Sequence, residues 1–161
     1  MPDDDMQRNR AYAESDLPRY LKREAPFTTC AANDLRDVCH TASVVAGWWR
    51  SGNLDLIGTI NEPAGPLMRL LGGALVAQKL CLVHSEISEA MEGHRKGLSD
   101  DKLPHRSMLE VELADALIRI FDLAGALKLD IGGAVAEKMA FNARRADHKP
   151  EARAAAGGKA Y

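Results

Sequence analysis

Aromatic residues are scarce in this chain: they make up 5% of its 161 residues, although 46% of the residues are hydrophobic. Much of the hydrophobic content is alanine and leucine, which favour packed helices over a sandwich of β-sheets. A chain of this length fits one domain and is long enough to bury a substantial core. The composition therefore predicts an all-α domain.

Excess positive charge, paired cysteines and long apolar runs are also missing. The formal net charge of -2 and the sequence pI of about 6.2 exclude a general basic field of the kind that marks nucleic-acid binders. Cys30, Cys39 and Cys81 are odd in number and form no CxxC pair, which disfavours a disulfide scaffold or a structural zinc site. The N-terminus is acidic and polar, and no apolar run is expected to approach the length needed to cross a bilayer. We therefore expect a cytoplasmic protein that binds neither nucleic-acid polymers nor membranes.

Glycine and proline divide the chain into four expected helices. Residues 1–28 are expected to form a loosely ordered lead-in with a short helix around DLPRYLKR, residues 29–148 the all-α domain and residues 149–161 a flexible tail. Asn33 is expected to cap a first helix, which ends before a connector over residues 52–66. Residues 67–97 are expected to form one long helix or two consecutive helices, with a C-terminal cap at Gly97. Ser107 begins a third helix that closes near Lys128, and a fourth begins near Asp130, so the chain resembles a helix bundle.

Two pairs of acids interrupt apolar stretches of the second and third expected helices. Glu86 and Glu89 lie three residues apart, and so do Glu112 and Asp115. This spacing places both members of a pair on one helix face, and antiparallel packing would let the two pairs face each other. Like charges near 4 Å repel by about 4 kcal/mol at an effective dielectric constant of about 20, so a cation is expected between them. Carboxylate oxygens favour Mg²⁺ or Mn²⁺, and the absence of a Glu-x-x-His pattern disfavours a di-iron centre.

A single acidic pair is more often part of a solvent-exposed helix face. We interpret Glu92, Glu110 and Asp122 as such solvated charges, or as groups that lie next to the metal ligands. The two pairs, with the phrase ELADALIRIFDLAG that begins at Glu112, resemble the metal site and third helix of the MazG-like all-α nucleoside triphosphate pyrophosphohydrolases. The resemblance covers about residues 79–148, with weaker support over residues 35–50. It implies Mg²⁺-dependent cleavage of a nucleoside triphosphate to the monophosphate and pyrophosphate, by a dimer or a dimer of dimers, in the host cytoplasm if the protein is phage-encoded.

The resemblance also implies roles for individual residues. Glu86, Glu89, Glu112 and Asp115 would hold the metal ions, and Glu89 or Glu86 would act as the general base, with Glu89 preferred. Candidate contacts to phosphate, sugar or base are Lys79, Lys138, Asn142, Arg145, Trp49, His40 and Arg119. For several of these the alternatives are ordinary: a solvated basic face for the KxxxNxxR pattern, and core packing for His40, Trp48 and Trp49.

Departures from the family pattern bear on the substrate. Residues 52–78 look longer than the usual connector, and Lys96 and Arg119 stand where relatives that cleave pyrimidine nucleotides carry aromatic residues. We therefore expect a purine substrate, with dGTP or GTP first. Two alternatives stay open: a helical dimer that binds a nucleotide or a partner protein without catalysis, and a phosphoribosyl-ATP pyrophosphohydrolase.

Overall fold

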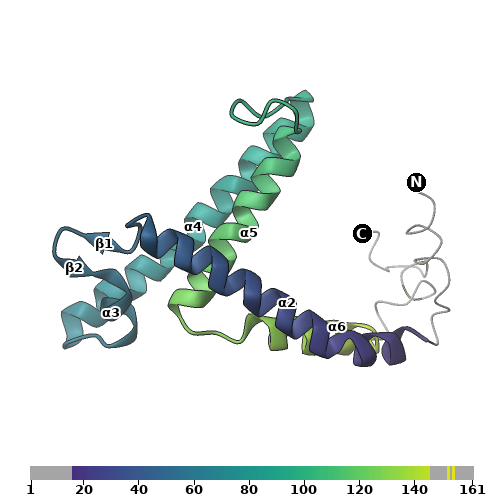
Figure 1. The fold of residues 1–161 in the computed structure, drawn as a ribbon, viewed down its shortest axis with the longest axis horizontal. Helices are drawn as coiled ribbons and strands as arrows, with labels where there is room; N and C mark the ends of the chain where they lie inside the picture. The colour runs from purple at the N-terminus through teal and green to yellow at the C-terminus, as the bar shows by residue number, and fades with distance from the viewer. Residues whose placement is uncertain (1–15, 146–151, 153, 155–161) are drawn as a thin grey trace. The chain divides into compact units, whose positions relative to one another are not determined.

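The computed structural model describes residues 16–145, 152 and 154. In chain order its elements are α2 (Leu17–Val45), β1 (Arg50–Ser51), β2 (Leu54–Asp55), α3 (Leu56–Asn61), α4 (Pro66–Lys96), α5 (Met108–Ala126) and α6 (Ile131–Asn142) (Figure 1). The expectation of an all-α fold is confirmed for the described residues, in which the two strands form a short antiparallel hairpin. The chain divides into two compact units, the first comprising Met1–Asn33 with Ile131–Tyr161 and the second Asp34–Asp130.

The first long helix begins earlier than the sequence indicated. α2 starts at Leu17 and continues through Pro26, so the prediction that Asn33 caps it is wrong. Asn33 instead caps a different helix: its Oδ1 accepts a hydrogen bond from the backbone N–H of Gly132, at 3.0 Å, in the first turn of α6. Pro18 and Pro26 contributed to the interpretation of residues 1–28 as a loosely ordered lead-in, yet Pro18 lies in the first turn of α2, where a missing N–H costs little. Of the expected lead-in, residues 1–15 lie outside the described residues, as do most of residues 149–161.

The expected connector over residues 52–66 contains β2 and the short helix α3, and β1 directly precedes it. Arg50 pairs with Asp55 and Ser51 with Leu54. Asp55 then caps α3, because its side chain accepts a hydrogen bond from the backbone N–H of Ile57 at 3.0 Å. α3 packs against α4, and its apolar residues contact the small core cluster of Trp49, Leu123 and Ala126.

α4 and α5 form an antiparallel helical hairpin in the second unit (Figure 1). α4 is one continuous helix and ends at Gly97, whose φ of 63° is the left-handed conformation that favours glycine, so the predicted cap is confirmed. Ser107 caps α5 as predicted, with its side chain accepting from the backbone N–H of Glu110. A Cβ at Gly93 would lie 2.8 Å from the Met108 side chain. Glycine at this position therefore allows the two helices to approach closely.

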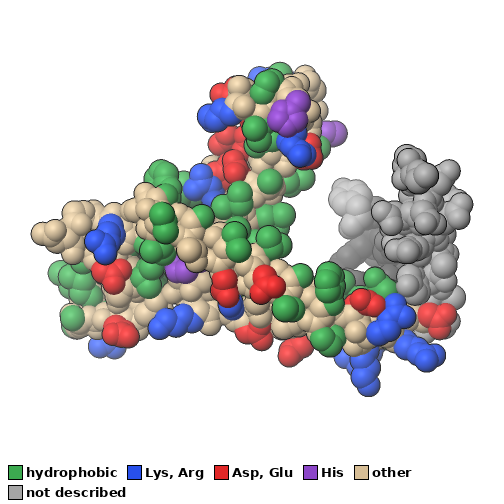
Figure 2. Space-filling model, in the orientation of Figure 1, with side chains coloured by type: hydrophobic (Ala, Val, Ile, Leu, Met, Phe, Trp, Pro, Cys, Tyr) green, Lys and Arg blue, Asp and Glu red, His purple; other side chains and the backbone are tan. Residues whose placement is uncertain are grey.

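α4 carries much apolar surface that the described residues leave open. An 18-residue window of this helix has a mean hydropathy of 1.4, and 6% of the window is buried. By length and composition alone α4 could cross a membrane, a test that core helices of soluble proteins also pass. The expectation that no apolar run approaches the length of a membrane span is therefore wrong for this helix. Figure 2 shows hydrophobic side chains among the charged ones on the viewed surface.

Candidate metal and nucleotide site

Three of the four predicted metal ligands converge between α4 and α5. Glu86, Glu89 and Glu112 each offer a carboxylate oxygen within 4.8 Å of the others. Glu86 and Glu112 are buried, and Glu89 is exposed. The buried faces of the two helices otherwise consist of small residues at this level, including Ala90 and Ala116. This close packing places the acids of α4 opposite those of α5, as the spacing predicted.

Asp115, the fourth predicted ligand, lies one turn after Glu112 on α5. It is partly buried and lines a pocket beside the three acids. Its negative charge contributes to raising the pKa of Glu112. Asp115 is therefore part of the same electrostatic site, although its oxygens are not among those grouped within 4.8 Å.

The pKa of Glu112 is raised to about 7. Burial is the first cause, followed by a hydrogen bond with Glu86 that favours the protonated form, and then by the charges of Glu89, Glu86 and Asp115. Glu112 therefore keeps a proton near neutral pH because its surroundings disfavour another negative charge. A divalent cation would replace that proton, and a donor set made only of carboxylate oxygens fits Mg²⁺ or Mn²⁺.

Arg119 contacts the cluster directly. Its Nε lies 2.6 Å from Oε1 of Glu86, whose side chain is 7% exposed. The same Nε is buried and has no partner that satisfies hydrogen-bond geometry. The two observations agree if the contact is an ion pair in which the N–H direction misses the carboxylate oxygen. We therefore treat it as an electrostatic contact.

A pocket of about 360 Å³ adjoins the acids in the second unit. It is lined by Ser43, Trp48, Lys79, Leu82, Asp115, Ile118, Arg119 and Asp122. Its volume falls in the range of small-molecule sites, which start at about 300 Å³. Two cations and two acids share this lining with apolar side chains. The pocket can therefore accommodate a ligand that has both an apolar part and charged groups.

Asp122 organises one wall of this pocket, and the sequence analysis did not assign it that role. Its carboxylate is buried and accepts a hydrogen bond from Trp49 Nε1 at 2.7 Å. Its Oδ1 also lies 2.9 Å from His40 Nδ1, and its Oδ2 lies 3.9 Å from Lys79 Nζ. One signal was present in the sequence: Asp122 lies seven residues after Asp115, which places both on one face of α5.

Trp49 and His40 hold positions in this network, behind the pocket lining. Trp49 is 2% exposed and belongs to the core cluster, whereas its neighbour Trp48 is exposed and lines the pocket. Lys79 Nζ lies 4.1 Å from the Trp49 ring centroid. Burial lowers the pKa of Lys79, and Asp122 partly opposes that effect. Of the two tryptophans, Trp48 is therefore the one placed to stack on a ligand.

The three candidates on and just after α6 belong to the first unit, whereas the acids belong to the second. Lys138 Nζ lies 4.9 Å from the Phe141 ring centroid, and Asn142 Oδ1 is buried without a hydrogen-bond partner among the described residues. Arg145 is the last residue of the continuous described range. Lys138 and Asn142 lie one turn apart on α6, but Arg145 lies beyond the end of the helix, so the three residues of the KxxxNxxR pattern do not share one helix face.

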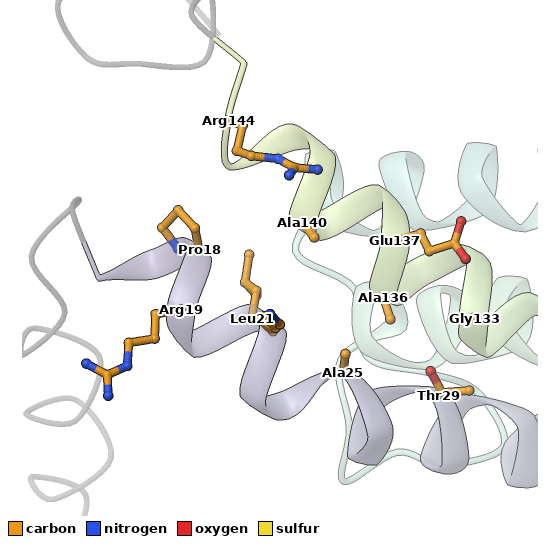
Figure 3. Close-up of a pocket in the computed structure, with 11 residues that line it drawn as sticks. Pro18, Arg19, Leu21, Ala25, Thr29, Gly133, Ala136, Glu137, Ala140 and Arg144 are labelled. Carbon is orange, nitrogen blue, oxygen red and sulfur yellow. The ribbon is translucent and has the colours of Figure 1, made fainter.

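The first unit has a groove of its own between α2 and α6 (Figure 3). It has a volume of about 670 Å³, and Ala25 and Ala136 point toward each other across it. Arg19 points away from α6 in this view. The interpretation of residues 1–28 as a loosely ordered lead-in did not predict this groove, because the groove requires a continuous helix from Leu17 onward.

Comparison of the chain with protein-family models, with curated proteins and with solved structures gives no match.

Proposed function

We propose that this protein is a Mg²⁺-dependent nucleoside triphosphate pyrophosphohydrolase with a MazG-like, bundle-type fold. The observation that carries the proposal is the convergence of Glu86, Glu89 and Glu112, with Asp115 on the next turn. The adjoining pocket supports a nucleotide ligand, because Lys79 and Arg119 offer positive charge beside apolar side chains. Mn²⁺ would serve the same oxygen ligands.

The acids would hold the metal ions with their carboxylate oxygens. Bound divalent cations neutralise phosphate oxygens and lower the pKa of a bound water. Water then attacks the α-phosphorus, the bond from that phosphorus to the bridging oxygen breaks, and pyrophosphate leaves. Glu89 is the preferred proton acceptor because it is the exposed member of the group, and Glu86 is the second choice.

The pocket would hold the rest of the nucleotide. Trp48 offers an aromatic face for the base, while Lys79 and Arg119 would approach the phosphates. The hydrogen bonds of Asp122 to His40 and Trp49 would support the pocket wall from behind. We favour a purine triphosphate, dGTP or GTP first, and include Lys138, Asn142 and Arg145 as phosphate or sugar contacts.

A homo-oligomer is part of the proposal, because α4 and α5 each present an exposed apolar stripe. The stripes consist of Leu80, Ile87 and Met91 on α4 and of Leu113, Leu117 and Ile120 on α5. Their spacing follows the helical repeat, so each set shares one face. A second copy that covers these stripes would form a bundle from two hairpins. The same stripes favour the second candidate function, a helical dimer that binds a nucleotide or a partner protein without catalysis.

The test is a hydrolysis assay on the common ribonucleoside and deoxyribonucleoside triphosphates and on phosphoribosyl-ATP, each with Mg²⁺, Mn²⁺ or EDTA. Released pyrophosphate is split by inorganic pyrophosphatase and detected as phosphate. We expect metal-dependent release from one or a few purine triphosphates, and loss of that release in Glu89→Gln. Glu110→Gln is the matched control, because Glu110 is an exposed acid of α5 that pairs with Arg106. Pyrophosphate release from phosphoribosyl-ATP alone would identify a phosphoribosyl-ATP pyrophosphohydrolase. No release from any substrate would favour the helical dimer that binds without catalysis.

A further inference from the structure

Arg119 is a cation placed within the acidic cluster by the geometry of α5. It follows Glu112 by seven residues and Asp115 by four, so the three side chains share one helix face. From there its Nε reaches across to Oε1 of Glu86 on α4, at 2.6 Å. Glu86 is one of the three acids whose oxygens converge. Positive charge therefore lies against the cluster before any metal ion is bound.

A competing cation could break the ion pair between Arg119 and Glu86. Arginine and carboxylate usually pair through two parallel hydrogen bonds, which fix the geometry of both groups. Here the Nε atom is buried without a partner that satisfies hydrogen-bond geometry, so this atom adds no directional bond to the ion pair. The Arg119 side chain is also 41% exposed and lines the pocket beside Lys79 and Asp115. It therefore has an open space into which it can turn.

We propose that Arg119 is the resident counter-cation of the metal-free site, and that a divalent cation displaces it from Glu86 into the pocket. A metal ion bound to Glu86 would repel a guanidinium on the same carboxylate, and the released guanidinium would face the region assigned to the phosphates. This inference rests on the proposed function only in taking the acids as metal ligands. It makes Arg119 a positioning residue that lowers the metal affinity of the empty site.

Mn²⁺ binding without nucleotide, followed by the electron paramagnetic resonance signal of free Mn²⁺, tests the proposal. Arg119→Gln should bind Mn²⁺ about tenfold more tightly than wild type, because it removes a charge that competes at short range. Arg119→Lys keeps the charge and should stay close to wild type. Arg95→Gln is the matched control, since Arg95 pairs with Glu92 at an exposed position, and its affinity should be unchanged.

A second readout uses the unmodified protein. In a Mg²⁺ titration, the Nε–H resonance of Arg119, assigned by its loss in Arg119→Lys, should move, while that of Arg95 should stay in place. Unchanged or weaker Mn²⁺ binding by Arg119→Gln would overturn the inference. An Arg119 Nε–H resonance that does not move when Mg²⁺ is added would also overturn it. Neither readout needs turnover: a wild-type protein that shows both effects but hydrolyses no nucleotide would refute the proposed function alone. Absence of metal binding in every variant would overturn both.

Discussion

Glu112→Gln should stabilise the metal-free protein at pH 8, which is the opposite of what most buried substitutions do. Glu112 shares a cluster with Glu86 and Glu89 in which the carboxylate oxygens lie within 4.8 Å of one another. At that distance two unit charges repel by about 3.5 kcal/mol at an effective dielectric constant of about 20, and by about 1 kcal/mol in bulk water. Glutamine keeps the shape and removes the charge, so the expected gain is about 1 to 3 kcal/mol.

The sign of the pH dependence follows from the pKa of Glu112, which is raised to about 7 from its ordinary value of 4.5. Below pH 4.5 the group is protonated in both the folded and the unfolded protein, and its contribution to stability is fully present. Between pH 4.5 and pH 7 the unfolded chain releases the proton and the folded protein retains it. The contribution is therefore lost over this range, and above pH 7 it changes no further.

Urea unfolding in EDTA, followed by circular dichroism, checks both the sign and the range. The variant and the wild type should have nearly equal unfolding free energies at pH 4.5 and should differ most at pH 8. Added Mg²⁺ at pH 8 should then stabilise the wild type more than the variant, because only the wild type has the full set of ligands. Glu110→Gln, on the same helix but exposed, should show no such pattern. A Glu112→Gln protein no more stable than wild type at pH 8 would refute the reasoning that these acids repel one another.

The other substitutions address catalysis, the pocket wall and assembly. Glu89→Gln and Asp115→Asn should keep the circular dichroism spectrum of the wild type. Each should reduce turnover at least about 100-fold, as expected for loss of a general base or metal ligand, and near-normal rates would contradict these roles. Trp49→Phe removes a hydrogen-bond donor from buried Asp122 and should cost about 1.5 to 3 kcal/mol in urea unfolding, and an unchanged midpoint would argue against the network. Leu117→Lys should shift the mass measured by light scattering toward the monomer, and an unchanged mass would remove α5 from the interface.

The sequence identified the acidic pairs because their chemistry and helical spacing are local properties. Glu86 and Glu89 lie within one turn of α4, as Glu112 and Asp115 do on α5, so the helical repeat alone places each pair on one face. The C-terminal end of α4 and the N-terminal end of α5 could also be predicted from the sequence. Gly97 supplies a left-handed residue at the end of α4.

The parts that escaped prediction depend on residues distant in the chain. The Asp122 bonds to Trp49 and His40 span 73 and 82 residues, and no periodicity reports such pairings. Asn33 has the residue type of a helix cap, but the helix that it caps begins 98 residues later, at Ile131. The continuity of α2 was also missed. Proline has a low helix propensity, yet α2 continues through the exposed Pro26.

Product analysis by phosphorus-31 nuclear magnetic resonance tests the central claim most directly. The protein is incubated with dGTP and Mg²⁺, and the signals are followed from substrate to products. The account predicts that the triphosphate signals are replaced by those of the monophosphate and pyrophosphate, and that EDTA or Glu89→Gln prevents the change. Formation of the diphosphate and orthophosphate would contradict attack at the α-phosphorus. An unchanged spectrum for dGTP and for every other common triphosphate would contradict the assignment of a nucleoside triphosphate pyrophosphohydrolase.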